Sequence, residues 1–149
     1  MSIRPIKLSD KTEYIKMADD FYSTDAVYKK VPKEHFENAF SELMRSTERI
    51  EAYIIESDGE IAGYILLAKF YSQEAGGETL WFDEIYIKEA FRGKGLATSA
   101  MTEIMEKYKD SSFRLEIEPE NEGAIRLYER MGFRMIPYGE MAKFKDILM

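Results

Sequence analysis

The sequence predicts a protein of the mixed α/β class, folded as a single domain over residues 1–149. The first observation is size, because 149 residues with 45% hydrophobic content suit one domain with a substantial core. The second is order: the predicted elements run β-α-α-β-β-β-α-β-α-β-β, which is typical of helices packed on a mixed sheet. The third is continuity, since no stretch rich in Pro, Gly and Ser divides the chain.

The first half of the chain predicts a strand, two helices and a hairpin. Apolar residues at positions 3, 6 and 8 indicate the strand, and Ser9 or Asp10 could cap the next helix. The second helix follows Pro32, and its apolar stripe consists of Phe36, Ala39, Phe40, Leu43 and Met44. Strands over residues 52–56 and 61–70 flank Asp58-Gly59, a dipeptide typical of a tight hairpin turn.

The second half alternates strands and helices. A strand over residues 80–88 leads through Arg92-Gly93-Lys94-Gly95 into a helix with a clear apolar period. A strand over residues 113–118 ends at Pro119, and Asn121 can cap a further helix. Two last strands are predicted at 133–136 and 141–147, around a turn at 137–139.

Composition and charge exclude several functions. With no Cys and one His, the chain has no disulfide, thiol nucleophile or Cys/His zinc site, and no metal is expected. A net charge of -7 and a pI near 4.9 argue against nucleic acid as a partner. The start of the chain lacks the apolar segment of a signal peptide, and no run suggests a membrane span. A cytoplasmic protein without a membrane partner is therefore expected.

The turn over residues 92–95 has the chemistry of an anion site. A helix N-terminus presents unpaired N–H groups, and Gly93 and Gly95 let the backbone approach a ligand closely. Arg92 and Lys94 add charged donors, so the turn suits a pyrophosphate. It is neither a Walker A loop nor a G-x-G-x-x-G motif, and an ordinary strand-to-helix turn is the alternative.

A second pattern follows on the later helix. It reads Asn121-Glu122-Gly123-Ala124-Ile125-Arg126-Leu127-Tyr128, then Gly132-Phe133. Taken alone, Asn121 is a helix cap and Tyr128 a core residue. Together with Arg92-Gly93-Lys94-Gly95-Leu96-Ala97, however, it resembles the GNAT superfamily of N-acetyltransferases. That family shows Q/R-x-x-G-x-G/A followed by N-x-x-A-x-x-x-Y and G-F, and the specific resemblance covers about residues 80–136.

The resemblance implies one GNAT domain with a mixed, mostly antiparallel sheet, splayed central parallel strands and about four flanking helices. Acetyl-CoA, as co-substrate, would lie between the strands at 80–88 and 113–118. Backbone groups of Ile85, Tyr86 and Ile87 would pair with its pantetheine arm. The residues expected to hold its pyrophosphate are Arg92, Gly93, Lys94, Gly95, Leu96, Ala97 and Thr98. Asn121, Ala124 and Tyr128 would lie at its thiol end.

Acetyl transfer needs a neutral amine, donors for an oxyanion and a proton for the leaving thiolate. In the family a carboxylate commonly takes the amine proton, which makes Asp83 and Glu84 the candidates. Side chains alternate along a strand, which would place Glu84 on the same sheet face as Tyr86, and Asp83 on the same face as Ile85. The family usually has a bulge here, so alternation does not decide which of the two is the base. Tyr128 would protonate the thiolate, and attack would be direct.

The expected acceptor is an amine of a small molecule or a peptide, and no motif identifies it. Residues that could line its pocket are Phe21, Tyr22, Tyr28, Tyr71, Trp81 and Tyr138, with the acidic Asp25, Glu74, Asp83 and Glu84. The alternatives are a non-catalytic acyl-CoA sensor and an interaction protein that binds no phosphate. Acetyl-CoA turnover and stabilisation by CoA would separate the three. A homodimer stays open, since dimers are the commonest oligomers.

Overall fold

The computed structural model describes residues 1–24 and 30–145, in two compact units, Met1–Glu116 and Ile117–Met149. The elements of the first unit are β1 (Ser2–Pro5), α1 (Lys11–Phe21), α2 (Lys33–Arg45), β2 (Ile50–Ser57), β3 (Glu60–Ser72), β4 (Gly77–Ile87), α3 (Leu96–Lys107) and β5 (Ser112–Leu115). Short 3-10 turns at Leu8–Asp10 and Glu89–Phe91 precede α1 and α3. The second unit contains α4 (Glu122–Arg130).

The strands form one five-stranded sheet in the order β1-β2-β3-β4-β5. All neighbours are antiparallel except β4 and β5, which run parallel. The predicted mixed, mostly antiparallel sheet is therefore confirmed. Asp58 and Gly59 form the predicted two-residue turn between β2 and β3, with φ angles of 53° and 78°.

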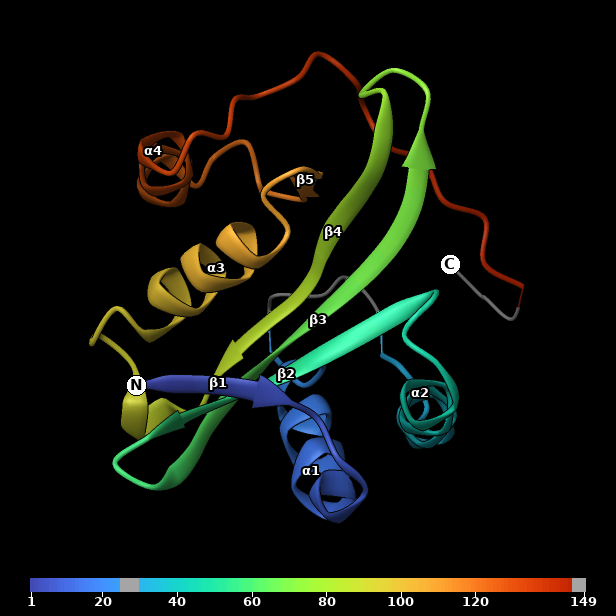
Figure 1. Cartoon of the computed structure of the whole chain (residues 1–149), viewed down its shortest axis with the longest axis vertical. Coiled ribbons are helices and arrows are strands. Elements are labelled where there is room, and N and C mark those ends of the chain that lie inside the picture. Colours follow the sequence, from blue (N-terminus) through green and yellow to red (C-terminus); the bar gives the residue numbers. More distant parts are fainter. Residues whose placement is uncertain (25–29, 146–149) are drawn as a thin grey trace. The chain divides into compact units, whose positions relative to one another are not determined.

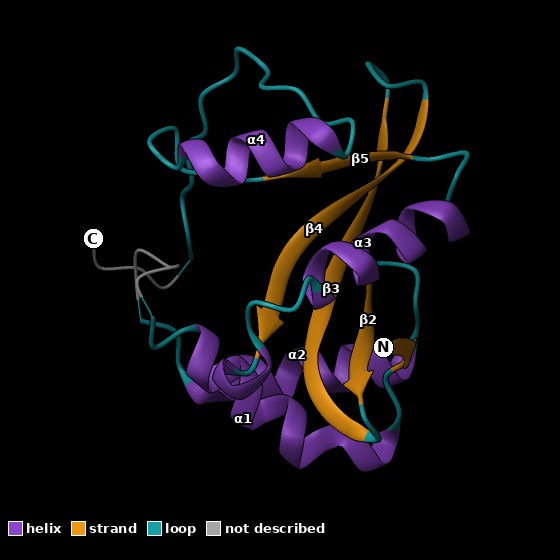
Figure 2. Ribbon diagram, turned by 90° about the vertical axis from the view of Figure 1, so that its left-hand side faces the viewer, coloured by secondary structure: helices purple, strands orange, loops and turns teal. Residues whose placement is uncertain are grey.

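Helices cover both faces of this sheet. In the first unit, α1 and α2 lie on one face and α3 on the other (Figure 1, Figure 2). The core beneath α1 and α2 consists of Tyr14, Ile15, Met17, Ala18, Phe36, Phe40, Leu43, Ala52, Ile54, Tyr64, Leu66 and Tyr86. On its own buried side, α3 contributes Leu96, Ala100, Met101 and Ile104. The apolar periods of α2 and α3 thus predict the buried faces correctly, although Met44 is 36% exposed.

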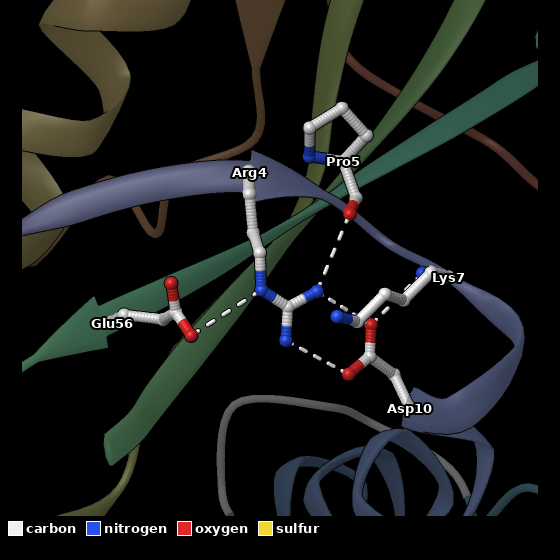
Figure 3. Close-up of polar contacts among 5 residues, drawn as sticks. All are labelled: Arg4, Pro5, Lys7, Asp10 and Glu56. Atoms are coloured by element: carbon white, nitrogen blue, oxygen red, sulfur yellow. Dashed lines mark hydrogen bonds and ion pairs between the residues drawn. The ribbon is translucent and has the colours of Figure 1, made fainter. Parts of the chain in front are cut away.

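Arg4 on β1 connects the sheet to the start of α1 (Figure 3). Its guanidinium donates to both carboxylate oxygens of Asp10, at 2.8 and 2.9 Å, and lies 3.3 Å from a Glu56 oxygen. The Lys7 N–H also donates to Asp10, at 2.8 Å. Because Arg4 and Lys7 occupy this carboxylate, Asp10 does not cap α1 with its side chain, contrary to the sequence prediction.

Two predictions for the strands near the C-terminus need correction. The strand expected over 113–118 stops at Leu115, because the next stretch of β4 is bulged and no longer continues the ladder. The structure has no strand among residues 133–145, so the prediction of two last strands is wrong for those residues. Pro137 offers no N–H for pairing, and Met135 and Met141 are 53% and 99% exposed. Residues 146 and 147 of that prediction lie outside the described residues.

Candidate active site

A bulge in β4 separates the two candidate bases. Leu67 of β3 pairs with Phe82 and Leu66 pairs with Glu84, so Asp83 is the extra residue of β4. Asp83 is exposed, whereas Glu84 is only 7% exposed. Glu84 lies on the sheet face covered by α1 and α2, as its hydrogen-bond partners show.

Two tyrosine hydroxyls hold the Glu84 carboxylate. Tyr64 on β3 donates to Oε1 at 2.5 Å, and Tyr22, directly after α1, donates to Oε2 at 2.5 Å. Burial raises the pKa of the Glu84 carboxyl; the two hydroxyls oppose this rise, and neighbouring Asp83 adds to it. The raised pKa moves this carboxyl toward the range in which a general base exchanges protons at neutral pH.

Tyr86 makes a second link between β4 and α1. Its hydroxyl donates to Asp20, so α1 and β4 exchange two tyrosine–carboxylate hydrogen bonds. Burial and the bond to Asp20 raise the pKa of Tyr86 to about 12. The Arg92 guanidinium lies 5.8 Å from the centre of the Tyr86 ring and donates to the Ile87 carbonyl at 2.7 Å. Contacts therefore run from the turn before α3 to the strand that carries Glu84.

The turn before α3 has the geometry expected of an anion site. Gly93 and Gly95 have φ angles of 79° and 73°. The first hydrogen bond of α3 runs from the Ser99 N–H to the Gly95 carbonyl, so the N–H groups of residues 96–98 precede the helical ladder. A pocket of about 120 Å³ is lined by Ile87, Phe91, Arg92, Gly93, Gly95, Leu96, Ala97 and Thr98. Every predicted pyrophosphate residue except Lys94 lines this pocket.

Beyond the bulge, β4 no longer pairs with β5. The parallel ladder runs from the pair Thr79–Ser112 to the pair Phe82–Leu115, while β4 continues to Ile87. Within the described part of the first unit, residues 83–87 therefore have β3 on one side and no strand on the other. This edge of β4 is where the resemblance implies that the parallel strands separate, and here β5 has already ended at Leu115.

The second unit carries the remaining predicted residues on α4. The side-chain oxygen of Asn121 accepts the Ala124 N–H at 3.1 Å, which confirms Asn121 as the helix cap. Tyr128 is half-buried, and this burial raises the pKa of its hydroxyl. Its ring packs edge-on against Phe133, with centres 5.9 Å apart. A wider concavity of about 520 Å³ in this unit is lined by Arg126, Glu129, Arg130 and Arg134, none of which the sequence singled out.

The residues predicted to line the acceptor pocket divide into several groups. Tyr22 contacts Glu84, and Phe21 packs edge-on against Tyr22 with ring centres 4.9 Å apart. Asp25 and Tyr28 lie outside the described residues, and Tyr138 belongs to the second unit.

The far end of the β3–β4 hairpin does not contribute to the surroundings of Glu84. Tyr71 lies five positions along β3 from Leu66, the partner of Glu84, which is about 16 Å along a strand. Glu74 lies farther still, in the loop beyond the strand end. Neither residue lies beside Glu84, and their place in the acceptor pocket stays a prediction. Trp81 packs with Phe70 and Arg114 instead, at 6.5 and 5.5 Å from its ring.

Two residues of the site were not anticipated from the sequence. The sequence shows Tyr64 only as a residue of an alternating strand. Its position on the same sheet face as Glu84 depends on the pairing of β3 with β4. Gly63 gave no signal, yet a Cβ there would lie 2.0 Å from the Tyr86 carbonyl oxygen. The close approach of β3 to β4 at this point requires glycine.

Neither a metal centre nor a membrane span is found in the described residues. Residues 1–24 and 30–145 contain no group of three or more His, Asp or Glu side chains that could hold a metal ion. Their helices are all too short or too polar to cross a bilayer.

With this geometry in place, the sequence profile of the acetyltransferase (GNAT) family matches residues 14–133. The match covers most of the chain and parts of both units. The chain therefore belongs to the GNAT acetyltransferase family, a family of acyltransferases that use acetyl-CoA.

Known proteins of this family share both sequence and fold with the chain. The spermine/spermidine N(1)-acetyltransferase of Bacillus subtilis (strain 168) is 31% identical over 83 residues, covering 52% of this chain and 55% of that protein. The chain thus matches about half the length of this curated relative. A structure described as a possible acetyltransferase from Clostridium difficile 630 superposes with a TM-score of 0.80 at 18% identity, over 99% of this chain and 98% of that one. An aminoglycoside N-acetyltransferase solved in complex with CoA gives a TM-score of 0.74 at 14% identity, over 97% and 95% of the two chains.

Proposed function

We propose that the chain is an N-acetyltransferase that moves the acetyl group of acetyl-CoA directly to a primary amine, with Glu84 as the general base. The observation that carries this proposal is the buried Glu84 carboxylate, held by two tyrosine hydroxyls next to the open edge of β4. Burying an ionisable group costs free energy, and functional sites are where such groups are retained.

The residues of the first unit fit acetyl-CoA as the co-substrate. Backbone N–H groups from Gly93 to Thr98 would hold the pyrophosphate, since the two glycines leave the turn without side chains at positions 93 and 95. Arg92 and Lys94 would add positive charge. The backbone of Ile85, Tyr86 and Ile87 would pair with the pantetheine amides as it would with a peptide strand. Once bound, acetyl-CoA supplies the thioester whose carbonyl carbon accepts the amine.

Glu84 would remove the proton that blocks attack. An ammonium N–H of the acceptor donates to the Glu84 carboxylate, directly or through one water, and the proton passes to the oxygen. The freed lone pair of the nitrogen forms the C–N bond, the nitrogen gives up its second proton to solvent, and the C–S bond breaks to leave a neutral amide and the CoA thiolate. A backbone N–H near Ile85 would stabilise the carbonyl oxygen as negative charge develops on it. Glu84 then releases its proton to solvent.

Asp83 is the alternative base, and its exposure makes it the weaker candidate. An exposed carboxyl lacks the burial that raises the pKa of Glu84. We assign Asp83 an electrostatic role: together with Asp20, it makes the end of α1 and the bulge attractive to a cation.

Tyr128 would protonate the leaving thiolate, and Asn121 and Ala124 would lie near the thiol. The raised pKa of Tyr128 keeps its hydroxyl protonated and able to donate at neutral pH. The family match over residues 14–133 spans both units, which supports one functional domain over the whole chain. The change Tyr128→Phe should lower kcat with little effect on the affinity for acetyl-CoA.

The acceptor would be a cationic amine. The acidic residues around Glu84 favour a positively charged group, and the net charge of -7 agrees with this. The Bacillus relative is named for polyamines, so spermidine is the first acceptor to test.

A screen for release of the CoA thiol from acetyl-CoA tests the proposal. The panel contains polyamines, aminoglycosides, small monoamines and peptides with free N-termini. We expect thiol release with at least one class, and mass spectrometry should find one acetyl group on the amine and none on the protein. Protection against thermal unfolding by acetyl-CoA, without thiol release from any class, would instead identify a sensor.

A further inference from the structure

The two tyrosines that hold Glu84 differ in their surroundings. Tyr64 lies inside β3, is 0% exposed and packs against the rings of Tyr14 and Tyr86 at 5.2 and 5.8 Å. Tyr22 follows the last residue of α1, is partly exposed and packs against the rings of Phe21 and Phe36, whose centres lie 4.9 and 5.5 Å away. Of the two tyrosines, Tyr22 is therefore the one that is partly exposed to solvent.

Glu84 cannot meet an acceptor while both hydroxyls remain in place and the carboxyl stays buried. A general base must come within hydrogen-bond reach of the proton that it removes, or reach it through one water. At 7% exposure, with one tyrosine hydroxyl on each oxygen, the Glu84 carboxylate presents almost no surface to an acceptor. One side must open, and Tyr22 is the side chain that can turn away without disturbing the sheet.

The backbone around Tyr22 can stay fixed during such a movement. Asp20, two residues earlier, accepts the Tyr86 hydroxyl from β4 and keeps α1 against the sheet. The Tyr22 N–H remains bonded to the Ala18 carbonyl at 3.0 Å. The opening therefore needs only a change of the Tyr22 side chain.

Resting on the proposed role of Glu84 as base, we propose that the two tyrosines are positioning residues with different tasks. Tyr64 fixes the carboxylate throughout the reaction. Tyr22 covers Oε2 in the free enzyme and gives up this place to the N–H of the amine acceptor. The acceptor thus enters by replacing one donor with another, and the carboxylate keeps two hydrogen bonds before and after binding.

This division predicts different pH profiles for the two phenylalanine variants. Among the residues that the structure describes, the titratable groups that face Glu84 are Tyr14 on α1, Tyr22 directly after α1, Tyr64 on β3 and Asp83 beside it on β4. A hydroxyl that donates to the carboxylate lowers the pKa of Glu84, so its loss should shift the acid limb of the pH–rate profile to higher pH. The profile of kcat/KM reports the free enzyme, and that of kcat reports the complex with substrate.

We therefore expect Tyr64→Phe to shift the acid limb in both profiles and to lower kcat about tenfold. Tyr22→Phe should shift the acid limb of the kcat/KM profile but not that of the kcat profile. In the wild-type complex with the amine, the Tyr22 hydroxyl has already left Glu84, so its removal changes nothing there. The KM for the amine should not rise in Tyr22→Phe. A ¹³C NMR titration of the Glu84 carboxyl in the free protein provides a second readout and should show a raised pKa in both variants.

Tyr108→Phe is the matched control, because Tyr108 donates to the carboxylate of Glu51, outside the site. It removes the same type of hydrogen bond and should leave both acid limbs in place. The inference is overturned if Tyr22→Phe shifts the kcat profile as far as Tyr64→Phe does, since Tyr22 would then stay on Glu84 in the complex. It is also overturned if neither variant shifts a limb. An inactive wild-type protein across the amine panel is a separate result, which refutes the base role itself and this inference with it.

Discussion

Replacing Gly63 by alanine should destabilise the protein at the point where β3 meets the cofactor strand. The added Cβ would lie 2.0 Å from the Tyr86 carbonyl oxygen and 3.0 Å from the Ile87 Cα. A carbon–oxygen contact needs about 3.3 Å, so the strands must separate by more than about 1 Å. Neighbouring strands are spaced at only about 4.8 Å, and such a shift would weaken adjacent ladder bonds, including Lys88 N–H to the Ala62 carbonyl at 2.8 Å.

The expected cost is about 3 kcal/mol, the upper end of the range for overpacking. For a chain of this size, it corresponds to a fall in Tm of roughly 6–12 °C. Urea unfolding at pH 7 measures the free energy, and the KM for acetyl-CoA should rise because Tyr86 and Ile87 move.

Gly77→Ala is the matched control, since Gly77 begins β4 and a Cβ there would meet nothing within 4 Å. It should change the free energy of unfolding by less than about 0.5 kcal/mol. Equal stabilities of the Gly63 and Gly77 variants would refute the close approach of β3 and β4.

Three further changes probe the turn, the first helix and the base. Gly95→Ala puts a side chain at φ 73°, which costs about 1–2 kcal/mol, and it should also weaken CoA binding measured by calorimetry. Gly76→Ala, at φ 81° in the β3–β4 loop, should cost as much stability with unchanged CoA affinity; equal affinity losses would contradict the anion site. Asp10→Asn should cost about 1.5–3 kcal/mol at pH 7 in urea unfolding. Because the bond to Arg4 lowers the pKa of Asp10, its contribution is complete above the usual value of 3.8 and is lost as pH falls through the lowered pKa. The deficit of Asp10→Asn should therefore shrink in acid, and a deficit independent of pH would speak against the ion pair. The contribution of Glu84 to stability has the opposite pH dependence. Because burial raises the pKa of Glu84, stability is lost as pH rises from 4.5 through the raised pKa. Glu84→Gln should accordingly melt at or above the wild-type Tm at pH 8 and lose that advantage below pH 4.5, and a variant less stable only at pH 8 would contradict this.

Much of the fold could be predicted because local patterns specify it. The helical periods of α2 and α3, the Asp58-Gly59 turn and the Asn121 cap each depend on residues close in sequence. The shape of the turn at Gly93 and Gly95 was predicted for the same reason. The strands predicted at 133–136 and 141–147 are absent from the described residues 133–145, because an apolar stretch forms a strand only where its backbone finds a pairing partner.

The choice between Asp83 and Glu84 could not be made from the sequence. It depends on the bulge, which arises from the pairing of β3 with β4 and reverses the alternation at one residue. The two tyrosines that donate to Glu84 could not be predicted from the sequence for a related reason. Tyr22 and Tyr64 are separated from Glu84 by 62 and 20 residues, and only the tertiary fold brings them together.

The central claim is that Glu84 takes the proton from the amine, and kcat/KM of two neighbouring variants tests it most directly. With acetyl-CoA and an amine accepted by the wild-type protein, Glu84→Gln should reduce kcat/KM by about 10²–10⁴-fold, the usual contribution of a general base. Asp83→Asn, one residue away on the exposed bulge, should reduce it less than tenfold. A Glu84→Gln variant with kcat/KM within tenfold of the wild-type value would contradict the account.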